Sequence, residues 1–431
     1  MPSPPFRAAA ALIAMLSATT ILSQFFRSST NVIAPELIRD LALSPEALGL
    51  ANAAFFLALL AIQVPVGILF DRIGVRATVV GLALLSVAGA LMHAVVATGT
   101  GLTLARFLLG LGHGGSFMST IVLCSHWYPR ERWSTVMSWV FALSMLGVVL
   151  AGTPLALASQ HIGWRMAFVG MAGLSALTGV LFLILVRDDP PGYVRAVHRA
   201  EGAREALAGF VQILRLRGIM PVLGLQTVAY AVMAGVMGLW AGPYLHDVHG
   251  LDVVARGNVL IAMAAAQTVG VLAFGPLDRL FDTRKWVAIW GAAVTLAILI
   301  ALASQPRPPA WLAITHLVAL CGASSYGVHV VTHARAFYPP WLVGRGATTA
   351  NMAQLLGCAL VPLGTGFIPS FFPQSATGYS PVAYQWIFAT IAATLAAGLA
   401  VYLTSSDVRP SAAPAVHEPQ EAAIASVRKE G

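Results

Sequence analysis

The chain has 431 residues, of which 58% are hydrophobic and only 10% are charged. A soluble domain carries about a quarter charged residues, so this composition excludes an ordinary soluble protein and predicts one that spans a membrane. The formal net charge of +8 comes from basic residues in alternate loops, which is a topology signal and does not predict nucleic-acid binding. The three cysteines lack the spacing of metal sites or disulfides, and we expect no metal and no cofactor.

The first half of the chain contains six predicted spans, each with about the 20 apolar residues that a bilayer requires. The first segment is too long for the apolar core of a cleavable signal peptide, so we interpret it as a span. An acidic loop that suits the periplasmic side separates it from the second. The predicted spans are residues 8–35, 47–70, 77–96 and 102–127, followed by two that are separated near 161–165.

A long polar segment, residues 187–218, divides the chain. It opens on Asp-Asp-Pro-Pro-Gly, a helix stop, and then carries five arginines, so we interpret it as a cytoplasmic linker with a surface helix at about 202–216. Alternation of the basic loops places both termini and the linker in the cytoplasm. Six further spans are predicted to start near Ile219, Ala255, Trp286, Ala310, Gly344 and Pro381. The predicted organisation is an N-terminal bundle at 1–186, the linker, a C-terminal bundle at 219–404 and a disordered cytoplasmic tail at 405–431.

The most informative stretch is the short charged turn between the second and third predicted spans, residues 67–76. Its charges must lie at the water interface, because charge at the bilayer centre is costly. Gly67 would allow another helix to approach closely, and Asp71 could pair with an arginine or face a helix N-terminus. Arg72 and Arg76 mark the turn as cytoplasmic.

This turn resembles the signature G-x-x-x-D-R-x-G-x-R, which joins helices 2 and 3 in the major facilitator superfamily. Every fixed position of the signature is present, at Gly67, Asp71, Arg72, Gly74 and Arg76. The resemblance implies an all-α membrane protein with twelve transmembrane helices in two pseudo-symmetric six-helix bundles, a central substrate cavity and alternating access. It also implies that the turn acts as a conformational latch between the two halves.

An internal repeat supports the prediction of two bundles. A shift of 210 positions aligns the Tyr-Pro pair at 128–129 with the pair at 338–339, and a shift of 207 aligns the Asp-Arg pair of the signature with Asp278 and Arg279. In this second copy the glycine-to-aspartate spacing is one residue shorter and the later glycine is missing. We interpret it as a degenerate second latch.

The first predicted span carries a polar face at membrane depth. Gln24, Arg27 and Asn31 are three and four residues apart, so they share one side of a helix. An arginine near mid-membrane must face a cavity or a partner, and the functional interpretation is an anion-binding residue, with Gln24 and Asn31 as further substrate contacts on the same face. The alternatives are a guanidinium fixed by backbone carbonyls and one that snorkels to the interface.

The fourth predicted span places Arg106, Gly110 and His113 on one face. Arg106-x-x-x-Gly110-x-Gly112 resembles the fourth-helix pattern of the same superfamily, in which the arginine is associated with proton coupling. The resemblance implies a coupling role for Arg106. The ordinary pKa of a histidine lies near neutral pH, so we also expect His113 to take part in coupling and to contact substrate. The alternatives are a packing histidine and an arginine that anchors the span at the periplasmic interface.

The pair Phe26-Arg27 and the fourth-span face resemble, more narrowly, the organic anion:cation symporter branch of the superfamily. That branch often has one acid before the first-helix arginine and another on helix four, and here Phe26 and His113 stand in those places. The usual carboxylate proton carriers are therefore missing, which puts proton symport by that route in doubt. The cavity keeps a positive balance, which favours an anionic substrate.

In the second half, polar residues fall on shared faces of three predicted spans. The candidate substrate contacts there are Gln226 and Tyr230, Tyr326 and His329, and Asn351 and Gln354. Amides at membrane depth are either contacts between helices or ligand contacts, and we weigh these alternatives equally. His329 and His333 are four apart, as in a metal site, but no third ligand is apparent.

These features predict a secondary transporter of the bacterial inner membrane, not an enzyme, that takes up a small organic anion (a carboxylate or sugar acid) with a proton or another cation. Its expected partners are that substrate, the coupling ion and the lipid bilayer, and not nucleic acid. One alternative is proton-coupled efflux of amphipathic compounds, which the poor match of residues 147–154 to the antiporter signature of helix five disfavours. A second alternative is a transporter-like receptor or membrane assembly component without flux.

Overall fold

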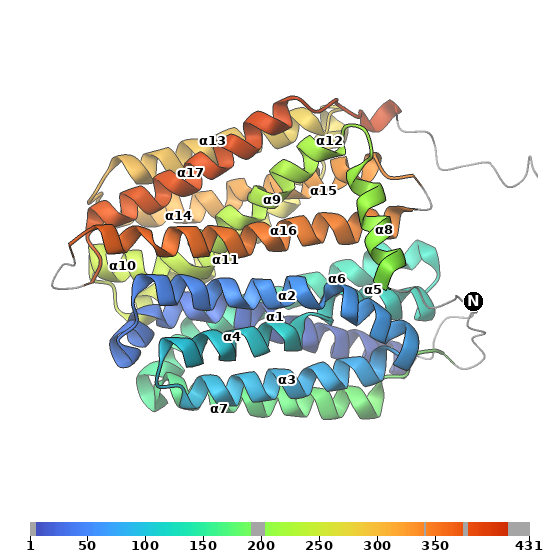
Figure 1. Ribbon diagram of the computed structural model, residues 1–431, viewed down its shortest axis with the longest axis horizontal. Helices are drawn as coiled ribbons and strands as arrows, with labels where there is room; N and C mark the ends of the chain where they lie inside the picture. Colours follow the sequence, from blue (N-terminus) through green and yellow to red (C-terminus); the bar gives the residue numbers. More distant parts are fainter. Residues whose placement is uncertain (1–5, 191–202, 340–341, 374–377, 413–431) are drawn as a thin grey trace, which may run out of the picture.

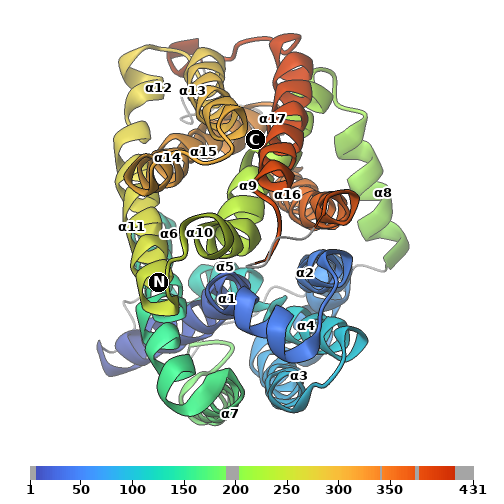
Figure 2. The ribbon, with the colours of Figure 1, turned by 90° about the vertical axis from the view of Figure 1, so that its left-hand side faces the viewer.

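The computed structural model describes residues 6–190, 203–339, 342–373 and 378–412. Long helices run nearly side by side and form two groups, one from each half of the chain (Figure 1). Seen along the helices, the N-terminal group lies against the C-terminal group, and α8 runs across one side of their junction (Figure 2). Helices suit such apolar segments, because a backbone in hydrocarbon must pair its own N–H and C=O groups.

The N-terminal group is built from residues 6–185. Its helices are α1 (Phe6–Leu41), α2 (Pro45–Ile73), α3 (Val75–Val95), α4 (Gly99–His113), α5 (Ser116–Trp127), α6 (Arg130–Ala151) and α7 (Thr153–Leu185). Within α7, Gly163 has a φ of 80°, and at this residue one helix ends and another begins.

The C-terminal group follows the linker helix α8 (Ala203–Leu214). Its helices are α9 (Ile219–Gly235), the π-turn η1 (Val236–Trp240), α10 (Ala241–His249), α11 (Val253–Phe274), α12 (Leu277–Leu280), α13 (Lys285–Ser304), α14 (Ala310–Ala323), η2 (Ser324–Tyr326), α15 (Gly327–Ala336), α16 (Val343–Gly366), η4 (Ile368–Phe371) and α17 (Pro381–Leu403), before a last short turn, η5 (Pro410–Ala412).

The described residues contain 11 helical stretches that are long and apolar enough to cross a membrane. One of them, Thr135–Leu185, has 51 residues and includes the break at Gly163, so it accounts for two crossings. The structure therefore confirms the predicted all-α membrane fold with twelve crossings in two bundles.

The described helices differ in detail from the prediction, for example in the first, fourth and seventh crossings. The first continues through Pro35 to Leu41, because Leu37 and Leu41 are buried in the core. The fourth crossing is broken at residues 114–115, between α4 and α5, and the seventh contains the π-turn η1 between α9 and α10. These breaks change the rotation of the residues that follow them, which a single helical wheel cannot anticipate.

The bundles pack closely against each other at one end of the molecule. We call the end where α7 finishes and α9 begins the linker end, and the opposite end the far end. At the far end, a Cβ on Gly49 of α2 would lie 2.8 Å from the Cα of Gly366 of α16, and a Cβ on Gly257 of α11 would lie 2.8 Å from the Cα of Thr153 of α7. Only glycine permits such backbone contact, so the bundles are tightly closed at the far end.

The two bundles repeat one set of contacts at the linker end. The N–H of Arg76, at the start of α3, donates to Asp188 at 2.7 Å, and the N–H of Lys285, at the start of α13, donates to Asp407 at 3.2 Å. The side chains of Arg76 and Lys285 also donate to backbone carbonyls in the last turns of α7 and α17. These matching contacts support the internal repeat seen in the sequence.

Ordered chain extends into the segment that was predicted as a disordered tail. Asp407 also accepts a hydrogen bond from the Thr283 hydroxyl at 2.6 Å. Ser411 donates to Asp282 through its hydroxyl and its N–H, and these hydrogen bonds lower the pKa of the Asp282 carboxyl. The rest of that segment, 413–431, lies outside the described residues, as does the part of the linker at 191–202.

Candidate functional site

Arg27 lies near the middle of α1, at the junction of the two bundles. Its Nη1 donates to the Tyr230 hydroxyl of α9 at 3.5 Å, the outer limit of a hydrogen bond. Its guanidinium also lies 5.6 Å from the centre of the Phe56 ring in α2, a cation–π contact. Its Nε is buried and finds no hydrogen-bond partner within the described residues. The guanidinium is therefore only weakly satisfied by the protein.

A pair of amides lies on the same side of the C-terminal bundle as Tyr230. Gln226, one turn before Tyr230 in α9, donates through Nε2 to Oε1 of Gln354 in α16 at 3.0 Å. Gln354 and Asn351 are both half-buried. The structure thus brings Arg27, Tyr230 and the Gln226–Gln354 pair to helices that meet at the junction of the bundles.

Two other residues of the predicted first-span face have different surroundings. Gln24 is half-buried at the contact of α1 with α6. A Cβ on Gly147 of α6 would lie 2.9 Å from the Cβ of Gln24. Asn31 is 2% exposed and contacts the backbone of the seventh crossing, donating to the Met237 carbonyl at 2.7 Å. Of the three, Arg27 alone combines a formal charge with incomplete pairing.

Arg106 of α4 is fully buried inside the N-terminal bundle. Its Nη1 donates to the Phe26 carbonyl at 2.5 Å and its Nη2 to Oδ1 of Asn52 at 3.0 Å. The guanidinium also stacks 4.7 Å from the centre of the Phe55 ring. An arginine at the membrane interface would be exposed, so the alternative of an interfacial anchor is wrong.

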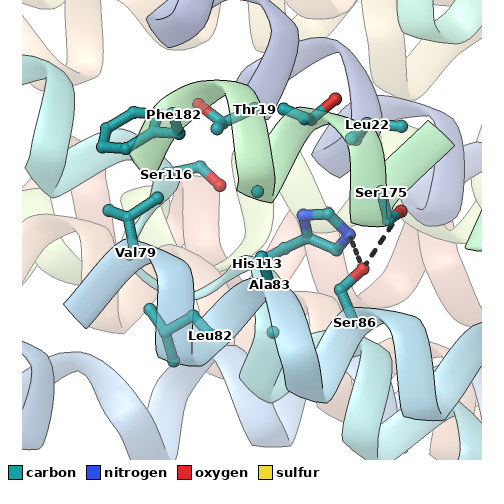
Figure 3. Close-up of a pocket in the computed structure, with 14 residues that line it drawn as sticks. Thr19, Leu22, Val79, Leu82, Ala83, Ser86, His113, Ser116, Ser175 and Phe182 are labelled. Atoms are coloured by element: carbon teal, nitrogen blue, oxygen red, sulfur yellow. Dashed lines mark hydrogen bonds between the residues drawn. The ribbon is translucent and has the colours of Figure 1, made fainter. Parts of the chain in front are cut away.

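His113 points into the N-terminal bundle, on the side of α3 and α7. Its Nε2 lies 2.9 Å from the Ser86 hydroxyl, and that hydroxyl donates to Ser175 at 3.5 Å. Ser86 thus links Nε2 of His113 to Ser175, and Nδ1 is the second ring nitrogen of His113. Figure 3 shows this second nitrogen turned away from Ser86 and Ser175.

A small cavity adjoins His113. It has a volume of about 30 Å³, enough for one or two water molecules. Its wall includes three further hydroxyl groups, those of Thr19, Ser116 and Thr178, among apolar side chains (Figure 3). In this conformation His113 therefore faces a small, mostly apolar cavity inside one bundle and not the junction where Arg27 lies.

The glycines around His113 make the fourth crossing pack closely. A Cβ on Gly110 would lie 2.7 Å from the Cβ of Ala58, and one on Gly112 would lie 2.7 Å from the Cα of Ser86. These contacts fix α4 against both α2 and α3. They hold Arg106 and His113 at set positions within the bundle.

The polar residues predicted in the tenth crossing lie inside the C-terminal bundle. Tyr326 is fully buried against Gly291, and Nε2 of His329 donates to the Phe274 carbonyl at 2.8 Å. His333 donates through Nε2 to the Ser406 carbonyl at 3.0 Å and accepts from the Tyr402 hydroxyl at 2.7 Å. In this conformation these side chains hold helices together and do not reach the junction.

The turn at residues 67–76 lies at the linker end. Gly74 has a φ of 91°, and a Cβ there would overlap the Asp188 carboxylate, so this position requires glycine. Gly67 is not at a close helix contact: a Cβ there would meet no described atom within 4 Å. The close crossing of α2 with the other bundle lies instead at the far end, at Gly49.

The charged residues of the two predicted latches are exposed or paired locally. Asp71 and Arg72 are exposed, as is Arg279 of the second copy. Asp278 is buried and lies 3.8 Å from Nε of Arg284 in its own loop. A latch role for Asp71 therefore belongs to a conformation in which the linker end is closed.

An ion pair that the sequence pattern did not predict joins the bundles at the far end. Nη2 of Arg256 in α11 donates to Oε1 of Glu36 in α1 at 2.5 Å, and Arg256 is only 2% exposed. The pattern places Glu36 in a loop and Arg256 at the start of a span, without a partner for either. An arginine in the first turn of an apolar helix is a charge that needs a partner, and that signal was present.

The charges at membrane depth are unbalanced. Arg27 and Arg106 are the formal charges that lie well inside crossings. The sequence has no Asp or Glu within the stretches 8–35, 47–70, 75–96, 99–127, 133–185, 219–246, 253–274, 285–304, 310–336, 343–371 and 381–403. Arg106 donates from both terminal nitrogens to backbone and amide oxygens, whereas the hydrogen bond of Arg27 is to the Tyr230 hydroxyl; within the described residues Nε of each arginine is without a partner.

The described helices form two bundles, and Arg27 and Tyr230 meet at their junction. The profile described as "Major Facilitator Superfamily" matches residues 16–362. The chain belongs to the major facilitator superfamily, whose members are transporters and not enzymes.

Three bacterial proteins are similar to this chain in sequence over much of its length. "Probable sulfoacetate transporter" of Cupriavidus necator is 23% identical over 264 residues, 59% of this chain and 61% of that protein. "Gentisate transporter" of Corynebacterium glutamicum is 25% identical over 347 residues, 77% of this chain and 75% of that protein. "Hexuronate transporter" of Escherichia coli is 23% identical over 310 residues, 66% of this chain and 70% of that protein. The chain thus spans about three-fifths of the first relative and more of the other two.

Solved structures have the same fold. A D-xylose-proton symporter has a TM-score of 0.74 and 16% identity, covering 92% of this chain and 98% of that one. A bacterial homologue of the human lysosomal transporter Spinster has a TM-score of 0.73 and 19% identity, covering 93% of this chain and 97% of that one. Likeness at these identities concerns the fold alone.

Proposed function

We propose that this protein carries a small organic anion, of the carboxylate or sugar-acid type, across the bacterial inner membrane by alternating access. The observation that supports this most is Arg27. Its guanidinium lies at the junction of the bundles, has an unpartnered Nε within the described residues and contacts only an aromatic ring and a phenol hydroxyl. A carboxylate would complete a bidentate, charge-assisted pair with it.

The surrounding groups suit a substrate that also carries hydroxyls. Tyr230 presents its hydroxyl to the arginine, and the Gln226–Gln354 amide pair lies one turn before Tyr230 along α9. Such groups orient the polar parts of a ligand, while the charge pair supplies most of the affinity. The names of the relatives, which include a gentisate and a hexuronate transporter, agree with a carboxylate ligand.

The coupling part of the proposal rests on His113 and Arg106. Uptake with a proton would use His113, whose Nδ1 adjoins a cavity with room for water. Arg106 would act beside it, by fixing α1 at Phe26. Since the apolar stretches given above contain no Asp or Glu, another cation or the substrate's own charge is the alternative source of coupling. The linker end would face the cytoplasm, in keeping with its basic loops.

Purified protein in proteoliposomes tests the proposal. The panel contains an aromatic carboxylate, a hexuronate, a sulfonated carboxylate and the neutral amide or sugar analogue of each, with and without an imposed pH gradient. We expect saturable flux of at least one anion and none of its neutral analogue. Flux of amphipathic cations alone would favour proton-coupled efflux. Absence of flux for every compound, with ligand binding retained, would favour a receptor or assembly role.

A further inference from the structure

The π-turn η1 frees one backbone carbonyl in the seventh crossing. In a regular α-helix the Met237 carbonyl would accept from the N–H of Ala241, four residues on. Here the N–H of Ala241 donates to the Val236 carbonyl, five residues back. Met237 is 4% exposed, and a buried carbonyl needs a partner. Turns of this kind are frequent at functional sites in helices.

Asn31 supplies that partner from the opposite bundle. Its Nδ2 donates to the Met237 carbonyl at 2.7 Å, and its Oδ1 accepts from the N–H of Gly242. The Met237 carbonyl and the Gly242 N–H are five residues apart, which is the spacing of a π-type hydrogen bond. Without Asn31 between them, these two groups would bond to each other. The amide of Asn31 thus stands between a donor and an acceptor that belong to the same helix. Both of its polar atoms are engaged, which argues against its use as a substrate contact here.

The fit between the two helices depends on Gly242. A Cβ at Gly242 would overlap the backbone carbonyl of Asn31, so a larger residue would separate α1 from α10. The π-turn also adjoins the candidate anion site, because a Cβ on Gly238 would lie 4.0 Å from the Arg27 carbonyl. Arg27 and Asn31 are one turn apart on α1, so a shift of α1 at one of them moves the other.

We propose that Asn31 is a positioning residue that holds the far end closed by completing the π-turn of the seventh crossing. When the far end opens, the Asn31 amide leaves, and the Met237 carbonyl pairs again within its own helix, with the N–H of Gly242 or of Ala241. The helix then loses little hydrogen bonding in either state, which is what a two-state element requires. The proposal rests on alternating access by this family and does not depend on which substrate is carried.

Distance measurements between spin labels test the proposal without any substrate. Labels at Ala97 and Gln305 lie in exposed turns of the N-terminal and C-terminal bundles at the far end. The three buried cysteines are replaced by alanine, and the protein is placed in nanodiscs. Asn31→Leu removes two buried hydrogen bonds. We therefore expect the population of molecules with a long distance between the labels to rise about tenfold relative to the population with a short distance. Hydrogen exchange of the amides at 241–245 should also become faster.

A control variant and a second test variant complete the experiment. Ser29→Ala is the matched control, because Ser29 is buried in α1 and its hydroxyl bonds only to its own helix, at the Phe26 carbonyl. It should leave the distances unchanged. Gly242→Ala separates the helices with Asn31 intact and should shift the distances in the same direction as Asn31→Leu. A native distance distribution in Asn31→Leu, or in Gly242→Ala should Asn31→Leu not fold, would overturn the proposal.

Discussion

Arg106 donates across the N-terminal bundle to the backbone carbonyl of Phe26, at 2.5 Å, and so holds the residue immediately before Arg27. Its other terminal nitrogen is held by Asn52 and its face by Phe55. The buried arginine is therefore not itself at the junction of the bundles. It fixes the backbone of the arginine that is.

This relationship predicts a specific effect of Arg106→Lys. Lysine cannot reproduce the planar fork that reaches two acceptors, so one of Phe26 and Asn52 loses its partner. We expect the free energy of unfolding to fall by about 1–3 kcal/mol, and the affinity for an anionic substrate to fall about tenfold because Arg27 is displaced. Thermal unfolding and equilibrium binding measure the two effects. Arg39→Lys, an exposed change at the far end, serves as the control. Native affinity in Arg106→Lys would show that Arg106 does not position Arg27.

A second prediction concerns proton coupling at His113. If Nδ1 takes up a proton during the cycle, His113→Gln should flatten the dependence of uptake on pH and leave substrate affinity within about twofold, since a glutamine amide does not titrate. Initial rates in proteoliposomes between pH 5 and pH 8, the range in which a histidine titrates, provide the measurement. His316→Gln in the C-terminal bundle is the control. A pH profile identical to that of the native protein would mean that His113 only packs against Ser86.

The exposed position of Asp71 leads to a third prediction. Asp71 makes no contact that stabilises the closed far end, so Asp71→Asn should not change thermal stability or substrate affinity in this state. Turnover should still fall at least about tenfold, because a charge pair biases the state in which the linker end is closed. Asp282→Asn alters an exposed carboxylate at the same end, bonded to Ser411 in its own bundle, and should have little effect. Turnover equal to that of the native protein at matched expression would exclude the latch role.

The sequence predicted the buried charge and the membrane crossings, but not the partners of the buried side chains. A charge within an apolar span is rare and costly, so Arg27 stands out in the sequence alone. The loop signature and the internal repeat predicted twelve crossings in two bundles, and the structure confirmed them. Partners could not be predicted in the same way, because the contact of Arg106 with Phe26 depends on how α4 rotates against α1. The direction of His113 depends likewise on the close packing of Gly110 and Gly112.

The junction between the bundles was the least predictable part of the molecule. Asn31 was predicted as a substrate contact because it shares a helical face with Arg27. Its partner is a carbonyl freed by a π-turn, and neither the turn nor the close approach at Gly242 has a sequence signal of its own. The Glu36–Arg256 ion pair depends in the same way on which ends of α1 and α11 meet.

The proposed transport of an anion depends most on Arg27 as the group that binds it. In a cavity of low dielectric, removal of one partner from a hydrogen-bonded charge pair costs about 2–5 kcal/mol, a loss of about 30-fold or more in affinity. Arg27→Lys should bind weakly because a lysine cannot form the bidentate pair, and Arg27→Ala should bind almost nothing. Gln24→Ala, one turn away on α1, is the matched control and should bind nearly as the native protein does.

The most direct measurement is calorimetric binding of one transported carboxylate and of its neutral amide to native protein and to the Arg27 variants, each shown to be monodisperse. We predict that native protein binds the carboxylate and not the amide, and that Arg27→Ala binds neither. Native affinity of Arg27→Ala for the carboxylate would contradict the assignment and leave Arg27 as a structural residue of the junction.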